Sequence, residues 1–265
     1  MTMPLNGRFL PSYLAAMLLV IGCAGRIFGQ AKPPVAPTYK VLAIAETGGI
    51  HKPFVDAAKI WLAHEATVDG FTIDYIEDTQ KIDAAYLSQY KVFLQLNYPP
   101  YNWTPTAMSA FHDAIENGTI GWVGFHHATL LGEFDGTQMW PWFSEFMGEI
   151  RFTKYIPTFA DGVVTVEAPN HPVMRNIPGS FTIKQEEWYT WSRSPRPNVR
   201  VLASVDENTY KPSSDIKMGD HPVIWTNEHV KARNVYLFMG HHPELLEDKA
   251  FTTLFHNSIV WAAGK

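Results

Sequence analysis

Residues 120–129 read Ile120-Gly121-Trp122-Val123-Gly124-Phe125-His126-His127-Ala128-Thr129, an apolar run up to Phe125 that two histidines follow. The apolar part predicts a strand that is buried on both faces, as in parallel sheets, because apolar and polar residues do not alternate. A helix signal lies upstream: Thr104-Pro105 forms an N-cap followed by proline, and Gly118 is a typical helix stop after Asn117. This region is therefore predicted to contribute a helix and then a buried strand.

The pattern repeats toward the N-terminus. Val41–Ala45, Phe71–Ile76 and Lys91–Leu96 are further predicted strands, and Pro53 opens an amphipathic helix between the first two. This alternation over 40–126 predicts an α/β fold with a doubly wound, mostly parallel sheet and helices on both faces, a flavodoxin-like three-layer sandwich.

The second half continues as one domain over 39–265, since no change in composition marks a boundary. A last helix is expected over Pro243–Ala262. Further strands are predicted at Gly162–Glu167, Phe181–Ile183, Val199–Val205, Val223–Thr226 and Val235–Met239.

The first 31 residues are predicted to be a signal peptide, because Arg8 precedes an apolar stretch, Tyr13–Cys23, that is too short to span a bilayer. Val20-Ile21-Gly22-Cys23 resembles a lipobox, which would attach a lipid anchor to Cys23. Cleavage near Ala31 is the favoured alternative and would leave a proline-rich linker over 32–38. Both alternatives predict an exported protein, periplasmic or extracellular.

Composition excludes two classes of function. Without residues 1–31 the chain carries 19 basic and 26 acidic side chains, a net charge of −7, and it has no run of Lys or Arg. Such a surface argues against nucleic acid as a partner. Cys23 is the single cysteine, so the domain has neither a disulfide nor thiol chemistry.

Histidines follow three of the predicted strands. In an open α/β sheet, ligands bind at the carboxyl ends of the strands, so His51, His126 and His241 are candidate site residues. We expect His127 to point away from His126, since successive side chains of an extended chain diverge. Tyr98 follows another strand at the same predicted edge.

Several short motifs resemble one known family. They occur in the family's order and span about 40–264, and they are Gly121–Thr129, His171-Pro172-Val173, Glu187-Trp188-Tyr189, Arg233 with Val235–His241, and Ile259–Gly264. On these motifs the chain resembles the ThuA-like (trehalose utilisation) family of the class I glutamine amidotransferase-like superfamily.

The resemblance implies the architecture of that superfamily and a carbohydrate substrate, a glycoside or an oxidised sugar. In the amidotransferases a cysteine nucleophile occupies the turn after the strand that ends here at Phe125. This chain has His126 there, and imidazole cannot replace a thiolate, so glutamine hydrolysis is excluded.

The expected roles follow from these positions. His126 or His241 would act as general acid or base, and Glu187 would orient or assist them. Substrate-binding roles are expected for five further residues: His51, Tyr98, His127, Trp188 and Tyr189.

A divalent metal is a further candidate cofactor, since His126, His241 and Glu187 are the side chains of a two-histidine, one-carboxylate site. Their spacing matches no recognised metal motif. The chain also departs from the family: Tyr155 stands where a histidine is usual, and Gln185-Glu186-Glu187 replaces an Asp-Glu pair. A non-catalytic sugar-binding or interaction module is therefore one alternative, and a metal-dependent hydrolase is another.

Overall fold

The computed structural model describes residues 36–134 and 136–265. The signal peptide expected over 1–31, with Cys23, and the first residues of the linker expected over 32–38 lie outside the described residues. The described chain belongs to one compact unit. Within it, no helix combines the length and the apolar character needed to cross a bilayer.

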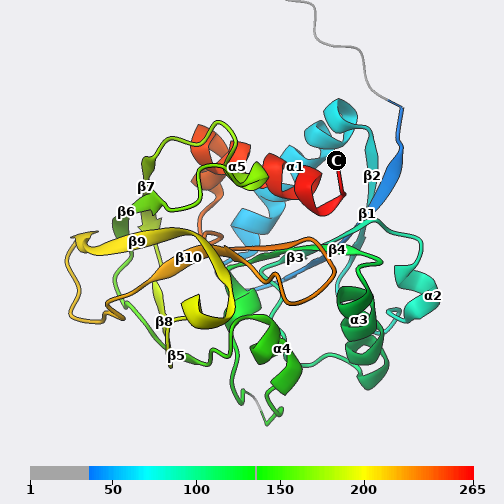
Figure 1. Cartoon of the computed structure of the whole chain (residues 1–265), viewed down its shortest axis with the longest axis horizontal. Coiled ribbons are helices and arrows are strands. Elements are labelled where there is room, and N and C mark those ends of the chain that lie inside the picture. Colours follow the sequence, from blue (N-terminus) through cyan, green and yellow to red (C-terminus); the bar gives the residue numbers. More distant parts are fainter. Residues whose placement is uncertain (1–35, 135) are drawn as a thin grey trace, which may run out of the picture. The chain divides into compact units, whose positions relative to one another are not determined.

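A nine-stranded sheet runs through the protein in the order β2-β1-β3-β4-β11-β10-β9-β6-β7 (Figure 1). The first five strands in this order are mutually parallel. They are β2 (Phe71–Ile76), β1 (Tyr39–Ala45), β3 (Val92–Leu96), β4 (Gly121–Phe125) and β11 (Asn234–Leu237). The predicted parallel α/β sheet is thus confirmed, and its strands β1, β3, β4 and β11 are almost wholly buried, as their apolar runs indicate.

Helices cover both faces of this parallel part. In Figure 1, α1 (Lys52–Asp69) and α5 (Lys249–Ala262) lie on one face, and α3 (Pro105–Asn117) and α4 (Pro141–Phe146) lie on the other. The short α2 (Ala84–Leu87) contacts α3. The start of α3 follows the expected cap, because Thr104 Oγ1 accepts the backbone N–H of Ala107 and Gly118 ends the helix with a φ of 70°.

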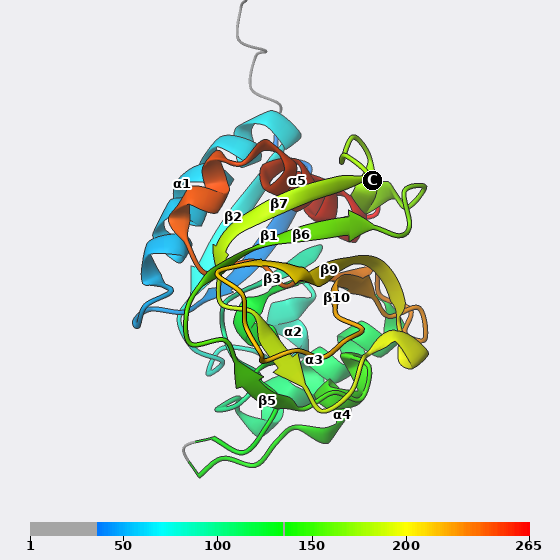
Figure 2. The same ribbon diagram turned by 90° about the vertical axis from the view of Figure 1, so that its left-hand side faces the viewer.

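The other four strands are antiparallel to their neighbours, so the sheet as a whole is mixed (Figure 2). They are β10 (Pro222–Thr226), β9 (Arg200–Lys211), β6 (Ala160–Val166) and β7 (Ser180–Glu186). No crossover helix separates β9 from β10 or β10 from β11, and strands joined without a crossover pair in an antiparallel sense. The strands predicted in this half are present.

A second sheet of two strands, β5 (Phe152–Tyr155) and β8 (Tyr189–Trp191), was not predicted. Both strands are very short, and β5 is largely exposed, so neither carries a hydrophobic pattern. Four 3-10 turns complete the described elements: His126–Thr129, Pro172–Met174, Arg196–Asn198 and Pro243–Glu247.

The predicted last helix is divided in two. A 3-10 turn covers Pro243–Glu247, and α5 begins only after Asp248, which has an extended backbone. The Asp248 carboxylate accepts the backbone N–H of Phe251 at 2.9 Å and so acts as the N-cap of α5. The apolar pattern runs through both pieces, which is why the pattern alone did not reveal the break.

The core beneath β4 is aromatic. The ring of Trp122 contacts Phe143 and Phe146 of α4, and its Nε1 donates to Gln95 Oε1 at 3.0 Å. Gly124 leaves the space for this ring, because a Cβ at that position would overlap the Trp122 side chain. Burying each such aromatic side chain contributes roughly 1.5–3 kcal/mol. This packing fixes the position of β4, and the turn that carries His126 follows β4 directly.

Candidate active site

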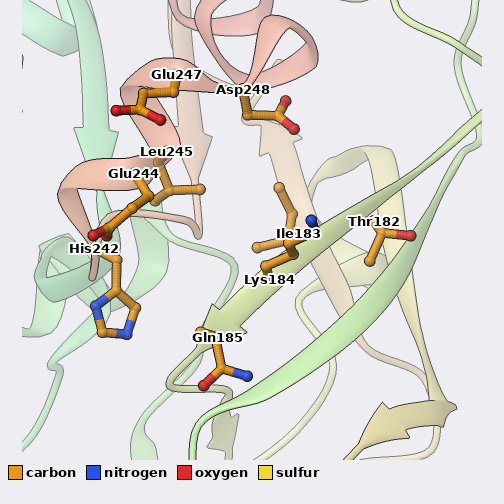
Figure 3. Close-up of a pocket in the computed structure, with 9 residues that line it drawn as sticks. All are labelled: Thr182, Ile183, Lys184, Gln185, His242, Glu244, Leu245, Glu247 and Asp248. Atoms are coloured by element: carbon orange, nitrogen blue, oxygen red, sulfur yellow. The ribbon is translucent and has the colours of Figure 1, made fainter.

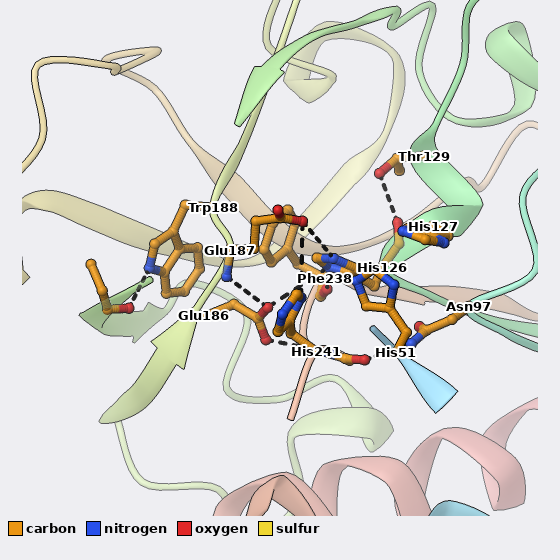
Figure 4. A network of polar contacts seen from close by, with 12 residues as sticks. His51, Asn97, His126, His127, Thr129, Glu186, Glu187, Trp188, Phe238 and His241 are labelled. Atoms are coloured by element: carbon orange, nitrogen blue, oxygen red, sulfur yellow. Dashed lines mark hydrogen bonds and ion pairs between the residues drawn. The ribbon is translucent and has the colours of Figure 1, made fainter. Parts of the chain in front are cut away.

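Four side chains from four separate segments meet where the parallel strands end (Figure 4). We call His51, His126, Glu187 and His241 the His/Glu cluster. All four are buried, and one nitrogen or oxygen atom from each lies within 4.8 Å of those of the others. The ring centroids of the three histidines are 4.5, 5.0 and 5.6 Å apart.

Each member comes from the end of a strand. His51 follows β1 and opens α1, His126 follows β4, and His241 follows β11. Glu187 lies between β7 and β8. The structure thus brings together the three residues expected to be catalytic, and it adds His51, which was expected only to bind substrate.

His126 occupies a strained turn. Its φ is 35°, a left-handed value that an L-residue adopts at a cost of ~1–3 kcal/mol. Two buried hydroxyl groups hold the strained peptide: Thr129 Oγ1 and Tyr236 Oη each donate to the His126 carbonyl at 3.0 Å. The sharp turn aims the imidazole back across the end of the sheet, toward β11 and the β7–β8 connection.

The protonation of the His126 ring follows from its hydrogen bond to β11. Nδ1 lies 3.1 Å from the backbone carbonyl of Phe238, which can only accept, so Nδ1 carries the proton. Nε2 therefore presents a lone pair. It lies 3.6 Å from Glu187 Oε2, and His241 Nδ1 lies 3.9 Å from the same oxygen.

Burial keeps the three imidazoles neutral. Desolvation is the main cause that lowers the pKa of His51, of His126 and of His241, in the last case to about 4, and the neighbouring histidines lower each of them further. Among the described residues, His51 Nε2, His126 Nε2 and His241 Nδ1 have no hydrogen-bond partner. The cluster is thus a convergence of buried ring nitrogens that have no hydrogen-bond partner.

Glu187 is the acidic member. Burial raises the pKa of its carboxyl group, with His241 and a hydrogen bond from Tyr189 acting in the opposite direction. Tyr189 packs its ring 4.5 Å from that of His126. Glu187 and Tyr189 therefore both face the cluster, as residues two apart along an extended segment do.

Trp188, between them, points the other way. Its Nε1 donates to the carbonyl of Ala160 at 2.8 Å and its ring stacks on Phe238, and the side chain has no exposed surface. Figure 4 shows it turned away from the histidines. The expectation that Trp188 binds substrate does not fit this position, because the tryptophan is part of the core.

Glu186 was not among the predicted site residues, yet it is completely buried beside His126. It accepts the backbone N–H of Glu187 at 2.9 Å and that of Gly240 at 3.2 Å, and so ties the β7–β8 connection to the end of β11. Burial raises the pKa of this carboxyl group to about 8 despite these hydrogen bonds. The only feature of the sequence that could have indicated Glu186 is its place directly before Glu187.

Gly240 allows the strand ends to approach one another closely. A Cβ there would lie 2.7 Å from Asn97 Oδ1 and 3.0 Å from His126 Cβ. Asn97 in turn donates from Nδ2 to the Gly240 carbonyl at 2.5 Å, which links the end of β3 to the end of β11.

His127 does not point away from His126, contrary to expectation. The two rings stack with centroids 5.3 Å apart, because His126–Thr129 forms a 3-10 turn and the alternation of an extended strand does not apply. His127 Nδ1 lies 3.1 Å from Glu46 Oε2, and His51 Nδ1 lies 3.6 Å from the same oxygen. Glu46 thus connects His127 with the cluster.

Two clefts are lined by chain neighbours of the cluster, and none of the four cluster residues lines either of them. One, of about 370 Å³, is lined by Tyr98 and Glu46 with six further residues: Thr47, Gly48, Gly49, Pro99, Tyr101 and Asn102. The other, of about 620 Å³, lies between β7 and the Pro243–Glu247 turn, and His242 and Gln185 are among its lining residues (Figure 3). Tyr155 lies on β5 and is 50% exposed.

An open α/β sheet with a sharp turn after a buried strand, facing a histidine on the next strand and a buried acid, defines the class I glutamine amidotransferase-like fold, here without its cysteine. The chain belongs to the ThuA family, described as trehalose utilisation, whose model matches residues 40–262.

Solved structures agree with this assignment. A ThuA-like protein from Bacteroides uniformis is 32% identical with a TM-score of 0.76, over 88% of this chain and 94% of that one. A ThuA-like protein from Parabacteroides merdae is 19% identical with a TM-score of 0.63, over 86% and 91%. A Thermoplasma acidophilum protein described as part of a GMP synthase shares the fold at 10% identity and a TM-score of 0.53, over 85% and 94%. A comparison with curated protein sequences finds no match.

Proposed function

We propose that this protein is an exported enzyme of carbohydrate utilisation that acts on a glycoside or an oxidised sugar at the His/Glu cluster. Membership of a family described as trehalose utilisation supports the substrate class. The observation that carries the proposal is the position of His126. Its side chain leaves the strained turn after β4, where this fold places its reacting group, and meets Glu187 at 3.6 Å.

The histidines are poor candidates for the acid–base role expected from the sequence. A group that transfers protons near neutral pH needs a pKa close to that pH, and burial lowers the pKa of both His126 and His241. They act instead as neutral donors of lone pairs. Glu187 is the proton acceptor, because burial raises the pKa of its carboxyl group and Tyr189 orients it by a hydrogen bond.

The sugar reaches the cluster through the cleft beside Glu46. Tyr98 offers an aromatic face of the kind that packs against sugar rings, and Thr47 and Asn102 offer polar groups for sugar hydroxyls. Glu46 extends from this cleft to His51 and His127. The cleft volume of about 370 Å³ lies in the range of small-molecule sites.

Turnover by the purified protein tests the proposal. Trehalose, other glycosides and their keto-sugar derivatives would be incubated with the wild type, and products would be followed by NMR. Glu187→Gln should lose turnover by at least ~100-fold, the usual range for a positioned proton-transfer group, and His126→Asn should also lose turnover because it removes the imidazole lone pair that faces the cluster. Asparagine suits the left-handed backbone at position 126, so the fold should be kept.

Three outcomes count against the proposal. Turnover that survives both substitutions would place the reaction elsewhere. Tight sugar binding without turnover would favour the non-catalytic binding module. Neither binding nor turnover with any sugar would remove the carbohydrate assignment.

Export has a separate test. Mass spectrometry of the protein from its native host should show a chain that begins near Lys32, or a lipid on Cys23 if the lipobox is used. A mature chain that retains residues 1–31 would contradict export.

A further inference from the structure

We propose that His51, His126 and His241 bind one divalent transition-metal cation, with Glu187 on the open side of the three nitrogens. This inference rests on the proposed function, since it concerns the same cluster. It adds a cofactor to that function and gives the neutral imidazoles a role.

The first argument is the direction of the lone pairs. His126 donates from Nδ1 to the Phe238 carbonyl, so Nε2 must be an acceptor or a ligand. His51 turns Nδ1 toward Glu46, 3.6 Å away, and this leaves Nε2 as its inward nitrogen. His241 contributes Nδ1. Within the described part of the cluster these three nitrogens have no hydrogen-bond partner, and all are buried.

The second argument is a count of donors and acceptors. His51 Nε2 and His126 Nε2 present lone pairs, and His241 Nδ1 presents a third in the tautomer with the proton on Nε2, all within 4.8 Å of one another and of Glu187 Oε2. A water molecule at their centre has only two hydrogens to donate. A cation bound by the three nitrogens pairs all three lone pairs at once, with Glu187 Oε2 beside it.

The third argument is charge. Three imidazoles lie among three carboxyl groups, Glu187 inside the cluster, Glu46 behind His51 and Glu186 beside His126. A dication among them offsets negative charge that a buried site would otherwise hold unpaired.

The groups behind the ligands are those that metal sites use. A histidine ligand commonly donates its second N–H to a backbone carbonyl or a carboxylate, which fixes its tautomer and orientation. The Phe238 carbonyl has this position for His126, and Glu46 Oε2 lies 3.6 Å from Nδ1 of His51, just beyond hydrogen-bond distance.

The spacing of the nitrogens is close to that of a bound site. Metal–nitrogen bonds of ~2.0–2.1 Å place neighbouring ligand atoms of a tetrahedron ~3.4 Å apart. The atoms of the cluster lie within 4.8 Å, so contraction by about an ångström through small side-chain rotations forms the site. A set of three imidazoles favours Zn²⁺, Co²⁺ or Ni²⁺ over Mg²⁺ or Ca²⁺, which prefer oxygen ligands.

Binding of Co²⁺ to the wild-type protein is the primary experiment. The purified chain would be dialysed against a chelator and titrated with Co²⁺, with the visible d–d bands recorded and metal content measured by mass spectrometry. We expect one Co²⁺ per chain, displacement by Zn²⁺, and no displacement by excess Mg²⁺. The absence of both a spectral change and stoichiometric metal would overturn the proposal without any variant.

Variants then locate the site. His241→Asn should lose the metal, whereas His242→Asn should keep it, because His242 is the adjacent imidazole but contributes no atom to the converging set. Glu187→Gln should also keep it. Circular dichroism would confirm that each variant is folded. Metal retained by folded His241→Asn, or lost equally from His242→Asn or Glu187→Gln, would contradict the three-histidine assignment.

The outcome is separable from that of the proposed function. Metal binding without turnover of any sugar would uphold this inference and count against the carbohydrate reaction. Turnover that needs no metal and resists chelation would do the reverse.

Discussion

His126 Nδ1 and the backbone carbonyl of Phe238 lie 3.1 Å apart, and this contact between the end of β4 and the residue after β11 decides which nitrogen of His126 faces the cluster. Because a carbonyl has no proton to give, the ring must donate, and its Nε2 lone pair is turned toward Glu187. A main-chain atom at the end of one strand thus sets the chemistry of a side chain on its neighbour.

The strained backbone of His126 gives the first prediction. Both His126→Asn and His126→Val lose the hydrogen bond to Phe238, but only asparagine readily adopts a φ of 35°. His126→Val should therefore be less stable than His126→Asn by about 1–3 kcal/mol. Urea unfolding monitored by tryptophan fluorescence measures the difference. Equal stability of the two variants would show that the turn relaxes without cost.

Gly240 gives the second. A Cβ at this position meets Asn97 Oδ1 and His126 Cβ, and the Asn97 amide is held by its bond to the Gly240 carbonyl. Gly240→Ala should lower the free energy of unfolding by about 1–3 kcal/mol, as overpacking does in other buried sites. Gly179→Ala is the matched control, since nothing lies within 4 Å of its added Cβ. Similar losses in both variants would rule out the clash as the cause.

A third prediction concerns His256, whose Nδ1 lies 3.0 Å from Asp69 Oδ2 and 2.8 Å from Glu65 Oε2, and so ties α5 to α1. These hydrogen bonds raise the pKa of His256 to about 10, above the value of ~6.5 expected in the unfolded chain. The folded state therefore holds the proton more tightly. The resulting stability is complete below about pH 6.5 and is lost as pH rises through 10.

The variant His256→Gln isolates this contribution. Because the side chain is 35% exposed, solvent screening limits the effect to about 1 kcal/mol or less. The difference in unfolding free energy between wild type and His256→Gln should be largest near pH 6 and should shrink toward pH 10. A difference that stays constant between these values would contradict the raised pKa.

Trp188 gives the fourth prediction, which separates a core residue from a binding residue. Since its ring is fully buried and stacked on Phe238, Trp188→Ala should cost about 3–5 kcal/mol of stability. Trp188→Phe should stay folded and keep any sugar affinity that the wild type shows, as measured by calorimetry. Selective loss of sugar binding in stably folded Trp188→Phe would show that this tryptophan is part of the binding site.

Much of the fold was predictable because its strands are buried on both faces. Val41–Ala45 and Ile120–Phe125 are continuous apolar runs, and Lys91–Leu96 is apolar apart from Lys91 and Gln95; helix signals such as Thr104-Pro105 lie between the strands. The exposed β5 has no such pattern, and the break at Asp248 interrupts a helix without interrupting its apolar residues. These features depend on contacts distant in the chain, which local sequence does not encode.

The candidate site divides in the same way. Sequence order placed His51, His126 and His241 at one edge, because parallel strands end on the same side of a sheet, and the family resemblance added Glu187. It did not reveal that the 3-10 turn keeps His127 beside His126, that Trp188 faces the core, or that Glu186 joins the β7–β8 connection to Gly240.

The sequence by itself determined the α/β class, the family and the absence of a cysteine from the domain, since these depend on residue types and their order along the chain. Only the tertiary structure decided that His51 completes the cluster, which nitrogen of His126 is free, and that the three imidazoles are neutral. These last properties depend on burial and on the distances between residues of different strands. Burial and these distances exist only in the folded chain.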